Sequence, residues 1–277
     1  GLGDVYKRQL LLSKDDELRK CIEISNPLGE DYSIMRTSPL NGMLTSLATN
    51  FNRRNKSVKL YEFGNIYLPK ALPLTELPDE RLNMTLGMYD SGDFFDLKGI
   101  VETIFAKLGM KEVVTYNPND NRPYLHPGRK ADIIIGDTVI GYMGEVHPEV
   151  ADTYNIGTKA YIAVLDVLEL EKHADFDVKY EGVAKYPAIT RDISLVMKKQ
   201  VLAGEVEAVI RENGGKLLEA YHLFDVYEGK NLPAGKKSYA VSFFMQDESK
   251  TLNDKQIDAI MKKIQTNLEQ KLGAQLR

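Results

Sequence analysis

Apolar side chains recur at helical spacing in two stretches of the first two thirds of the chain. Ser38 and Pro39 are typical of a helix start, and Gly109 is typical of a helix end. We therefore expect two amphipathic helices packed on a core, one after Ser38 and one before Gly109. Their apolar stripes are Leu40, Met43, Leu44, Leu47 and Phe51, then Leu97, Ile100, Val101, Ile104 and Leu108.

Apolar stretches at strand spacing lie on either side of the second helix. Gly136 and Asp137 separate two of these stretches and predict a tight hairpin, so we expect an antiparallel sheet. A short helix is expected from Pro148, and the charged run 169–181 is expected to be a linker. The predicted strands span 58–67, 83–89, 131–135, 138–143 and 160–168, with a proline-punctuated loop at 69–78.

The pattern after residue 185 predicts the order β-α-β-β-α-β. This order is typical of the ferredoxin-like fold, in which both helices cover one face of a four-stranded sheet and the other face stays open. Asn253 and Gln256 are expected to cap the longest helix, which Gly273 ends. The expected segments are a strand through Ile193, Leu195 and Met197, a helix through Val206, Val209 and Ile210, strands at 218–227 and 238–246, a helix through Ile257, Ile260, Met261, Ile264, Leu268 and Leu272, and an edge strand at 274–277.

Alternation along two of these strands predicts what the open face carries. If the more apolar set faces the core, the core set of strand 238–246 is Tyr239, Val241, Phe243 and Met245. The exposed set is then Ser238, Ala240, Ser242, Phe244 and Gln246, and strand 218–227 exposes Tyr221, Leu223, Asp225 and Tyr227. Rings stack on unpaired bases while hydroxyls and carboxylates meet base edges, so this face suits single-stranded RNA. An ordinary half-solvated face, or one covered by another subunit, is the alternative.

Composition and charge modify this prediction only slightly. With 277 residues and 43% hydrophobic content, the chain can form two domains with real cores. The net charge of −4 combines +3 over 185–277 with −7 over the rest, so a polyanion would prefer the C-terminal third. The single cysteine, Cys21, can form neither an internal disulfide nor a cysteine-based zinc cluster, and no apolar stretch is long enough for a membrane span. A cytoplasmic location is expected.

Residues 1–9 are predicted to be foreign to the protein. They can be back-translated into a sequence that resembles a transposon adaptor used in sequencing libraries, and no initiator Met precedes them. We expect them to be an artefact, excluded from fold reasoning, with the gene starting further upstream. An ordinary N-terminal segment is the alternative.

The histidines offer little support for catalysis or metal binding. His126 and His147 each precede a proline, and no H-E-x-x-H spacing is present. Structural roles are therefore favoured for both, as for His173 and His222. Glycine-rich phosphate loops are also missing from the sequence.

Several motifs carry a resemblance to a known family. In the C-terminal part they are 186–194 (YPAITRDIS), 223–229 (LFDVYEG), Lys237-Ser238 and 251–254 (TLND), which resemble the ferredoxin-fold anticodon-binding domain of the phenylalanine–tRNA ligase β subunit. Upstream, the motifs NPL at 26–28, MRTS at 35–38, LYEFG at 60–64, DLKG at 96–99, HPGR at 126–129 and GEVHP at 144–148 resemble that subunit's core domain. The resemblance covers nearly everything after residue 9.

The resemblance implies an α+β chain with two domains. A class II synthetase-like antiparallel sheet domain would span 10–180, and a ferredoxin-like anticodon-binding domain would span 185–277. In this family an α2β2 ligase charges tRNA(Phe) with phenylalanine, using ATP and Mg²⁺, and the α subunit is catalytic. Asp225, Tyr227 and Ser238 fall on positions that contact the anticodon, with Ser194 close by. Phe244 and Tyr221 are added from the alternation of the strands.

The resemblance also implies that this chain lacks an adenylate site. In the α subunit, the strand that corresponds to residues 63–67 leads to a phosphate-binding arginine. This chain has Leu68 and Pro69 there, and neither can bind an anion. Where α has a glycine-rich stretch ending in Glu-Arg, residues 161–170 contain neither glycine nor arginine. We therefore expect no catalytic residues, no metal site and no bound cofactor here. A free-standing single-stranded RNA-binding protein and an autonomous ATP-dependent ligase are the alternatives.

Overall fold

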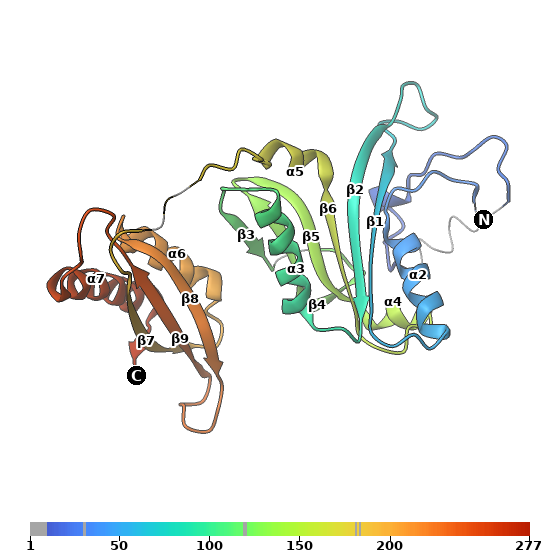
Figure 1. Cartoon of the computed structure of the whole chain (residues 1–277). Helices are drawn as coiled ribbons and strands as arrows, with labels where there is room; N and C mark the ends of the chain where they lie inside the picture. The colour runs from blue at the N-terminus through green and yellow to red at the C-terminus, as the bar shows by residue number, and fades with distance from the viewer. Residues whose placement is uncertain (1–9, 30–31, 119–120, 181, 183) are drawn as a thin grey trace. The chain divides into compact units, whose positions relative to one another are not determined.

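A computed structural model describes residues 10–29, 32–118, 121–180, 182 and 184–277 of the chain (Figure 1). The chain divides between Val178 and Lys179 into two units, each with its own sheet. The predicted artefact at 1–9 lies outside the described residues. None of the helices within the described ranges is long and apolar enough to cross a membrane.

The first unit is built on a six-stranded antiparallel sheet with the order β1-β2-β6-β5-β4-β3. Ile135 pairs with Thr138, so Gly136 and Asp137 form the predicted two-residue hairpin turn, with Gly136 at a φ of 57° that favours glycine. The strands are β1 (Val58–Leu68), β2 (Asp79–Tyr89), β3 (Val114–Asn117), β4 (Leu125–Ile135), β5 (Thr138–Val146) and β6 (Ala160–Asp166).

Helices cover both faces of this sheet, and strand β6 contributes to the core on each face. Ile162 and Val164 belong to one core, with α2 (Leu40–Asn52) and α4 (Pro148–Thr153). Ala163 and Leu165 belong to the other, with α3 (Phe94–Lys107) and α5 (Val167–His173). Since successive strand residues point to opposite faces, a continuous apolar strand can serve two cores at once. A short 3-10 helix, η1 (Glu17–Arg19), precedes α2.

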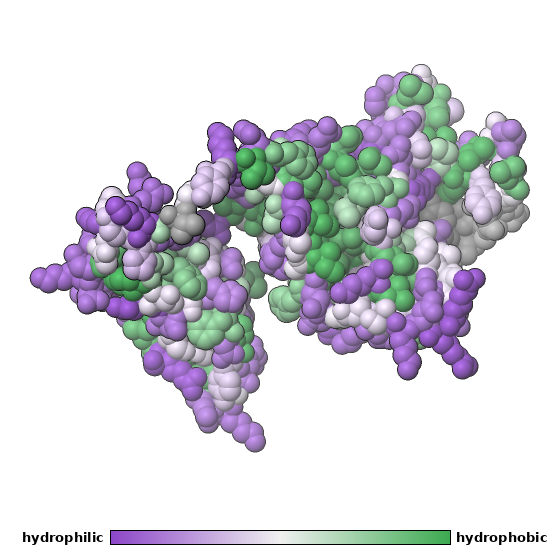
Figure 2. All heavy atoms as spheres, in the orientation of Figure 1, coloured by the Kyte–Doolittle hydropathy of each residue, from purple (hydrophilic) through white to green (hydrophobic). Residues whose placement is uncertain are grey.

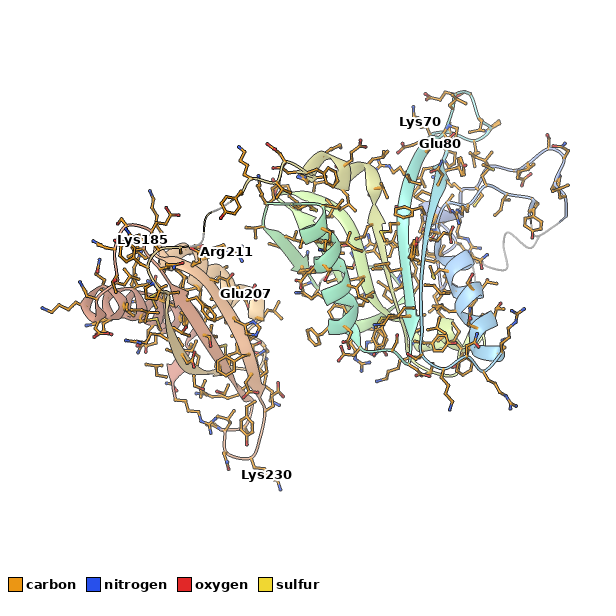
Figure 3. The ribbon with its side chains drawn as sticks, in the orientation of Figure 1. Lys70, Glu80, Lys185, Glu207, Arg211 and Lys230 are labelled. Atoms are coloured by element: carbon orange, nitrogen blue, oxygen red, sulfur yellow. The ribbon has the colours of Figure 1, made fainter. Side chains whose placement is uncertain are left out.

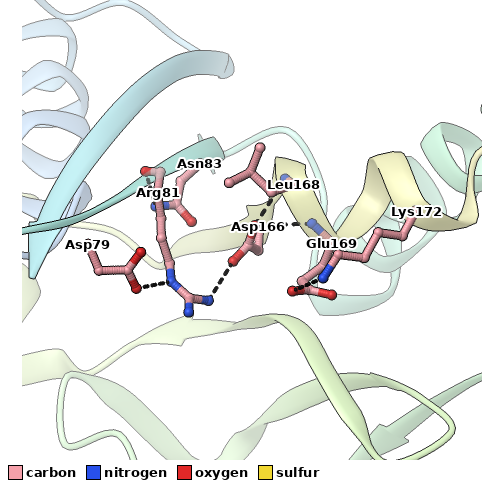
Figure 4. A network of polar contacts seen from close by, with 7 residues as sticks. All are labelled: Asp79, Arg81, Asn83, Asp166, Leu168, Glu169 and Lys172. Carbon is pink, nitrogen blue, oxygen red and sulfur yellow. Dashed lines mark hydrogen bonds and ion pairs between the residues drawn. The ribbon is translucent and has the colours of Figure 1, made fainter.

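A network of polar contacts joins β2, β6 and α5 (Figure 4). The guanidinium of Arg81 contacts Asp79 at 2.8 Å and Asp166 at 3.1 Å. The other carboxylate oxygen of Asp166 accepts hydrogen bonds from the backbone N–H groups of Leu168 and Glu169, at 3.0 and 3.2 Å. Asp166 is therefore the N-cap of α5, and its charge also favours the helix N-terminus.

Several expectations for the first unit are corrected. Strand β2 begins at Asp79 rather than at residue 83, and β4 begins at Leu125 rather than at residue 131. The four-residue strand β3 was not predicted. Strand β6 ends at Asp166, and helix α5 follows it where the pattern predicted the end of a strand and the start of a linker. The cap at Asp166 explains this difference, because it turns a short charged stretch into helix.

The second unit has the sheet order β10-β7-β9-β8, all antiparallel, with α6 and α7 packed on one face. This is the ferredoxin-like arrangement, and the α+β prediction is confirmed. The predicted capping box between Asn253 and Gln256 is present, and Gly273 ends α7 at a φ of 63°. The elements are β7 (Ile189–Lys198), α6 (Ala203–Gly214), β8 (Leu218–Tyr227), β9 (Lys236–Met245), α7 (Asp254–Leu272) and β10 (Gln275–Leu276).

Candidate nucleic-acid interface

Strand β9 alternates between the two faces of the second sheet as predicted. The side chains buried beneath the helices are Tyr239, Val241, Phe243 and Met245. The side chains on the opposite face are Ser238, Ala240, Ser242 and Phe244. Along β9, the face without helices, which we call the open face, is therefore lined by two serines, an alanine and one aromatic ring.

A β-bulge at Phe224 determines which residues of β8 reach the open face. After the bulge, Asp225 lies opposite Ala240 of β9. Tyr227 lies opposite Ser238. Directly opposed residues of antiparallel strands project to the same side, so the carboxylate and the phenol both belong to the open face. Asp225 is exposed and Tyr227 is half-buried.

Tyr221 does not reach the open face, which corrects its predicted place. It lies opposite Phe243, and Leu223 lies opposite Val241, so both pack against the helix-covered core. The guanidinium of Arg211, on α6, donates a hydrogen bond to the Tyr221 hydroxyl at 3.1 Å. The bulge inserts one residue into β8. From Tyr221 on, odd-numbered residues therefore face the core before the bulge and the open face after it.

Ser238 lies on the predicted face but is not exposed, which is a second correction. Only 3% of Ser238 is accessible to solvent. Its hydroxyl lies 3.2 Å from that of Ser194, and its cross-strand neighbours are Tyr227 and Val196. Ser194 itself is half-buried. The two hydroxyls therefore satisfy each other beneath larger neighbours.

The far end of the open face carries the remaining predicted ring. Phe244 is partly exposed and lies between Thr190 of β7 and Ala220 of β8. Both neighbours are exposed and small, which leaves part of the ring accessible to solvent.

Two polar residues of the open face were missed by sequence reasoning. His222, for which a structural role was expected, lies opposite Ser242 and is exposed on the open face, which corrects that expectation. On the other side of Ser242, in β7, the Asp192 carboxylate accepts a 2.5 Å hydrogen bond from the Ser242 hydroxyl. The strand pairing was the missing information, since neither residue stands out along the sequence.

Basic side chains gather at the end of the sheet near Tyr227. Lys230 projects from the β8–β9 hairpin (Figure 3). Lys199 pairs with Glu228 at 2.8 Å, and this bond lowers the pKa of Glu228. Lys236 donates a 3.3 Å hydrogen bond to Gln275. Lys230 and Lys236 therefore offer positive charge to an approaching polyanion, whereas the charge of Lys199 is offset by Glu228.

Four arginines of the first unit form ion pairs with carboxylates. The pairs include Arg36–Glu62 at 2.6 Å, Arg81–Asp166 at 3.1 Å, Arg122–Asp132 at 2.5 Å and Arg129–Glu145 at 2.6 Å. Glu145 is 3% exposed, and its bond raises the pKa of Arg129. These guanidinium groups help to hold the sheet together.

His126 and His147 make local structural contacts. The Nδ1 atom of His126 accepts a 3.1 Å hydrogen bond from the N–H of Gly128. The Nδ1 atom of His147 accepts a 3.3 Å bond from the N–H of Glu149 and caps α4. Both histidines thus have structural roles.

Comparison with known proteins places this geometry in a family. Residues 4–167, more than half of the chain, match the family described as phenylalanyl tRNA synthetase beta chain CLM domain. Residues 184–277 match the ferredoxin-fold anticodon binding domain. The chain belongs to the phenylalanyl-tRNA synthetase beta chain family. The resemblance inferred from the sequence motifs is confirmed.

Similar proteins carry the family name over nearly the whole chain. The phenylalanine–tRNA ligase beta subunit of Clostridium acetobutylicum is 43% identical over 97% of this chain. Those of Clostridium tetani and Moorella thermoacetica are 40% and 38% identical over the same share. The chain spans 34% of the length of each of these relatives.

Proposed function

We propose that this chain acts as a non-catalytic portion of a phenylalanine–tRNA ligase β subunit, which holds the anticodon of tRNA(Phe) and docks the catalytic α subunit of an α2β2 enzyme. The observation that carries the proposal is the position of Asp225 and Tyr227 on the open face of a domain that matches an anticodon-binding family.

The chemistry of the open face supports base recognition. The Tyr227 ring offers a stacking surface to an unpaired base. Among the described residues, nothing bonds to the Asp225 carboxylate, so it can accept hydrogen bonds from the N–H groups of a base edge without losing a partner. Phe244 offers a second ring along the same face. The basic side chains near Tyr227 would attract the RNA backbone.

The first unit supports a structural role. Its ion-paired arginines are already neutralised, and Leu68 ends β1 where a phosphate-binding arginine would be needed. Strand β6 is filled with buried apolar side chains. We therefore propose that ATP and Mg²⁺ act at the α subunit and that this chain alone does not form an adenylate.

The outer strand β1 supports a docking surface for another subunit. Tyr61 and Phe63 are 70% and 56% exposed, and their rings stack edge to face at 6.2 Å. Hydrophobic side chains gather on the surface of this unit (Figure 2). Exposed aromatic groups of this kind are enriched at the centres of protein interfaces.

The proposal is tested by binding of a phenylalanine anticodon stem-loop to the full chain. Asp225→Ala and Tyr227→Ala should each weaken binding by roughly 1–3 kcal/mol. Asp258→Ala, which removes the same charge from an exposed position on α7, is the matched control and should bind like the parent. Equal binding of a stem-loop with a scrambled anticodon would remove the specificity claim.

The alternatives predict different results in two further assays. A free-standing RNA-binding protein would not co-elute with a cognate α subunit at micromolar concentration, whereas the proposal requires co-elution. If the chain were an autonomous ligase, it would catalyse pyrophosphate–ATP exchange by itself. We expect no exchange in the absence of the α subunit.

A further inference from the structure

Strand β10 places Arg277 on the open face. Gln275 and Leu276 pair with Val196 and Leu195 of β7, and the N–H of Arg277 donates a 2.9 Å bond to the carbonyl of Ser194. Gln275 lies opposite Val196, which is on the open face, so Arg277 two residues later projects to the same side.

The side chain of Arg277 crosses the open face and meets Tyr227. Three strand spacings, about 14 Å, separate β10 from β8 in the sheet order. The Arg277 guanidinium carbon nevertheless lies over the Tyr227 ring, 5.5 Å from its centroid. The two side chains must therefore reach toward each other from opposite edges and meet above the strands between them.

Two residues on the open face near this contact are buried, although no helix covers that face. Ser238 and Val196 face away from the helices, yet they are only 3% and 9% exposed. Asp225 and Ala240, one pair further along the face, are exposed and half-buried respectively. Burial is thus confined to the end of the face that Arg277 and Tyr227 span.

A base cannot share Tyr227 with Arg277 in this arrangement. Insertion between two planar groups requires two van der Waals separations of about 3.5 Å each, which is more than the 5.5 Å between the guanidinium carbon and the ring centroid. The hydroxyl end of the ring rests on Gly229, where an added Cβ would lie 2.1 Å from the Tyr227 oxygen. The guanidinium therefore occupies a position that a stacked base needs.

We propose that Arg277 is a further RNA-binding residue that works as a movable strap. Without RNA it covers Tyr227 and Ser238; with RNA it leaves the ring, admits the base and binds a phosphate of the same loop. A phosphate offers a guanidinium charge-assisted hydrogen bonds, which the ring cannot, and the base replaces the cation on the ring. This inference rests on the proposed anticodon site.

Two variants of the full chain separate charge from shape in RNA binding. With the phenylalanine anticodon stem-loop, Arg277→Gln should weaken binding about fivefold at low salt, because one phosphate contact is lost. The slope of log Kobs against log salt should fall by about 0.7 relative to the parent, as for one phosphate of a single strand. Arg277→Lys should keep the parent slope. Lys262→Gln, on the exposed side of α7, is the charge control and should leave both quantities unchanged.

A thiol probe tests the covering of Ser238 directly. The only cysteine, Cys21, is buried, so Ser238→Cys introduces one reporter thiol at the covered position. Its reaction with a disulfide reagent should accelerate at least about tenfold when Arg277→Gln is added, since opening is no longer required.

The outcomes discriminate the strap from the anticodon site itself. Equal thiol rates with and without Arg277→Gln, an unchanged salt slope, or tighter RNA binding by Arg277→Gln would each overturn the strap. If the parent protein binds RNA and Asp225→Ala weakens that binding, the anticodon site stands even when the strap fails. A parent protein that binds no anticodon stem-loop would instead overturn the proposed function.

Discussion

The hydroxyl oxygens of Ser194 and Ser238 lie 3.2 Å apart across strands β7 and β9. Ser238 is almost fully buried, so replacing Ser194 by alanine leaves a buried hydroxyl without this partner. We expect Ser194→Ala to lower the free energy of unfolding by about 1–3 kcal/mol, and the double variant with Ser238→Ala to recover part of that loss. Urea unfolding of the four proteins measures the coupling. Strictly additive effects would show that the two hydroxyls do not interact.

Tyr221 and Tyr227 lie six residues apart on one strand. Truncating Tyr221 should mainly lower stability, whereas truncating Tyr227 should mainly weaken RNA binding. Tyr221→Ala removes packing against the core and the contact with Arg211, so we expect a stability loss of about 2 kcal/mol. Tyr227→Ala should mainly weaken binding of the anticodon stem-loop. Urea unfolding and RNA titration of both variants provide the comparison, and Tyr221→Phe, which loses only the hydroxyl, should stay within about 1 kcal/mol of the parent.

The two tyrosines also mark the limit of what the sequence predicts for the site. Alternation along β9 assigned its faces correctly, because no bulge interrupts its pairing with β7. In β8 the same alternation was correct for Asp225 and Tyr227 but wrong for Tyr221, because the bulge at Phe224 leaves no mark in the hydrophobic pattern. The burial of Ser238 depends on side chains from distant strands, and no local pattern encodes it.

For the fold, long periodic elements were predictable and short ones were not. Helix α7 shows its apolar stripe, its capping box and its terminal glycine in the sequence itself. Strand β3 has four residues, too few for a period, and forms only by pairing with β4. Helix α5 depends on a cap from Asp166 that also ends a strand. Such elements are determined by tertiary contacts more than by their own residues.

Thr85 carries a buried hydroxyl that finds no hydrogen-bond partner among the described residues. A hydroxyl removed from water without compensation costs free energy. We expect Thr85→Val, which keeps the shape, to leave the free energy of unfolding unchanged or to raise it by about 1 kcal/mol. Thr158→Val provides a contrast, because the Thr158 hydroxyl donates a 2.7 Å bond to Asp90. A clear loss of stability in Thr85→Val would show that the hydroxyl is bonded in solution.

Asp166 combines a helix cap with an ion pair, and two substitutions separate the contributions. Asp166→Asn can still cap α5 but loses the charge that faces Arg81, so we expect a stability loss below about 1 kcal/mol. Asp166→Ala loses both, and we expect a loss of about 1–2 kcal/mol. Thermal unfolding at low and high salt measures both. Salt should reduce the difference between the parent and Asp166→Asn.

Alkaline pH should destabilise the first unit through Tyr154. Burial raises the pKa of this phenol well above its ordinary value of 10.0, and its hydroxyl donates a 2.8 Å bond to Asn41. The unfolded chain loses the proton first, so the contribution is complete below pH 10 and falls as the pH rises toward the folded pKa. The expected fall is about 1.4 kcal/mol per pH unit.

Tyr154→Phe should therefore make the free energy of unfolding less dependent on pH above 10, although it loses the bond to Asn41 at neutral pH. Tyr180→Phe is the matched control, because Tyr180 is 90% exposed. Urea titrations between neutral pH and pH 11 measure the slopes. The same alkaline slope in the parent and in Tyr154→Phe would contradict the assignment.

Strand β6 gives its odd-numbered side chains to one hydrophobic layer and its even-numbered ones to the other. Loss of packing in one layer therefore destabilises β6, and the other layer packs against the same strand. Damage to the α3 side, such as Ala163→Gly, should thus loosen α2 as well, and hydrogen exchange of both helices should accelerate together. The sheet therefore joins its two faces into one cooperative body, because the same strand supports both layers.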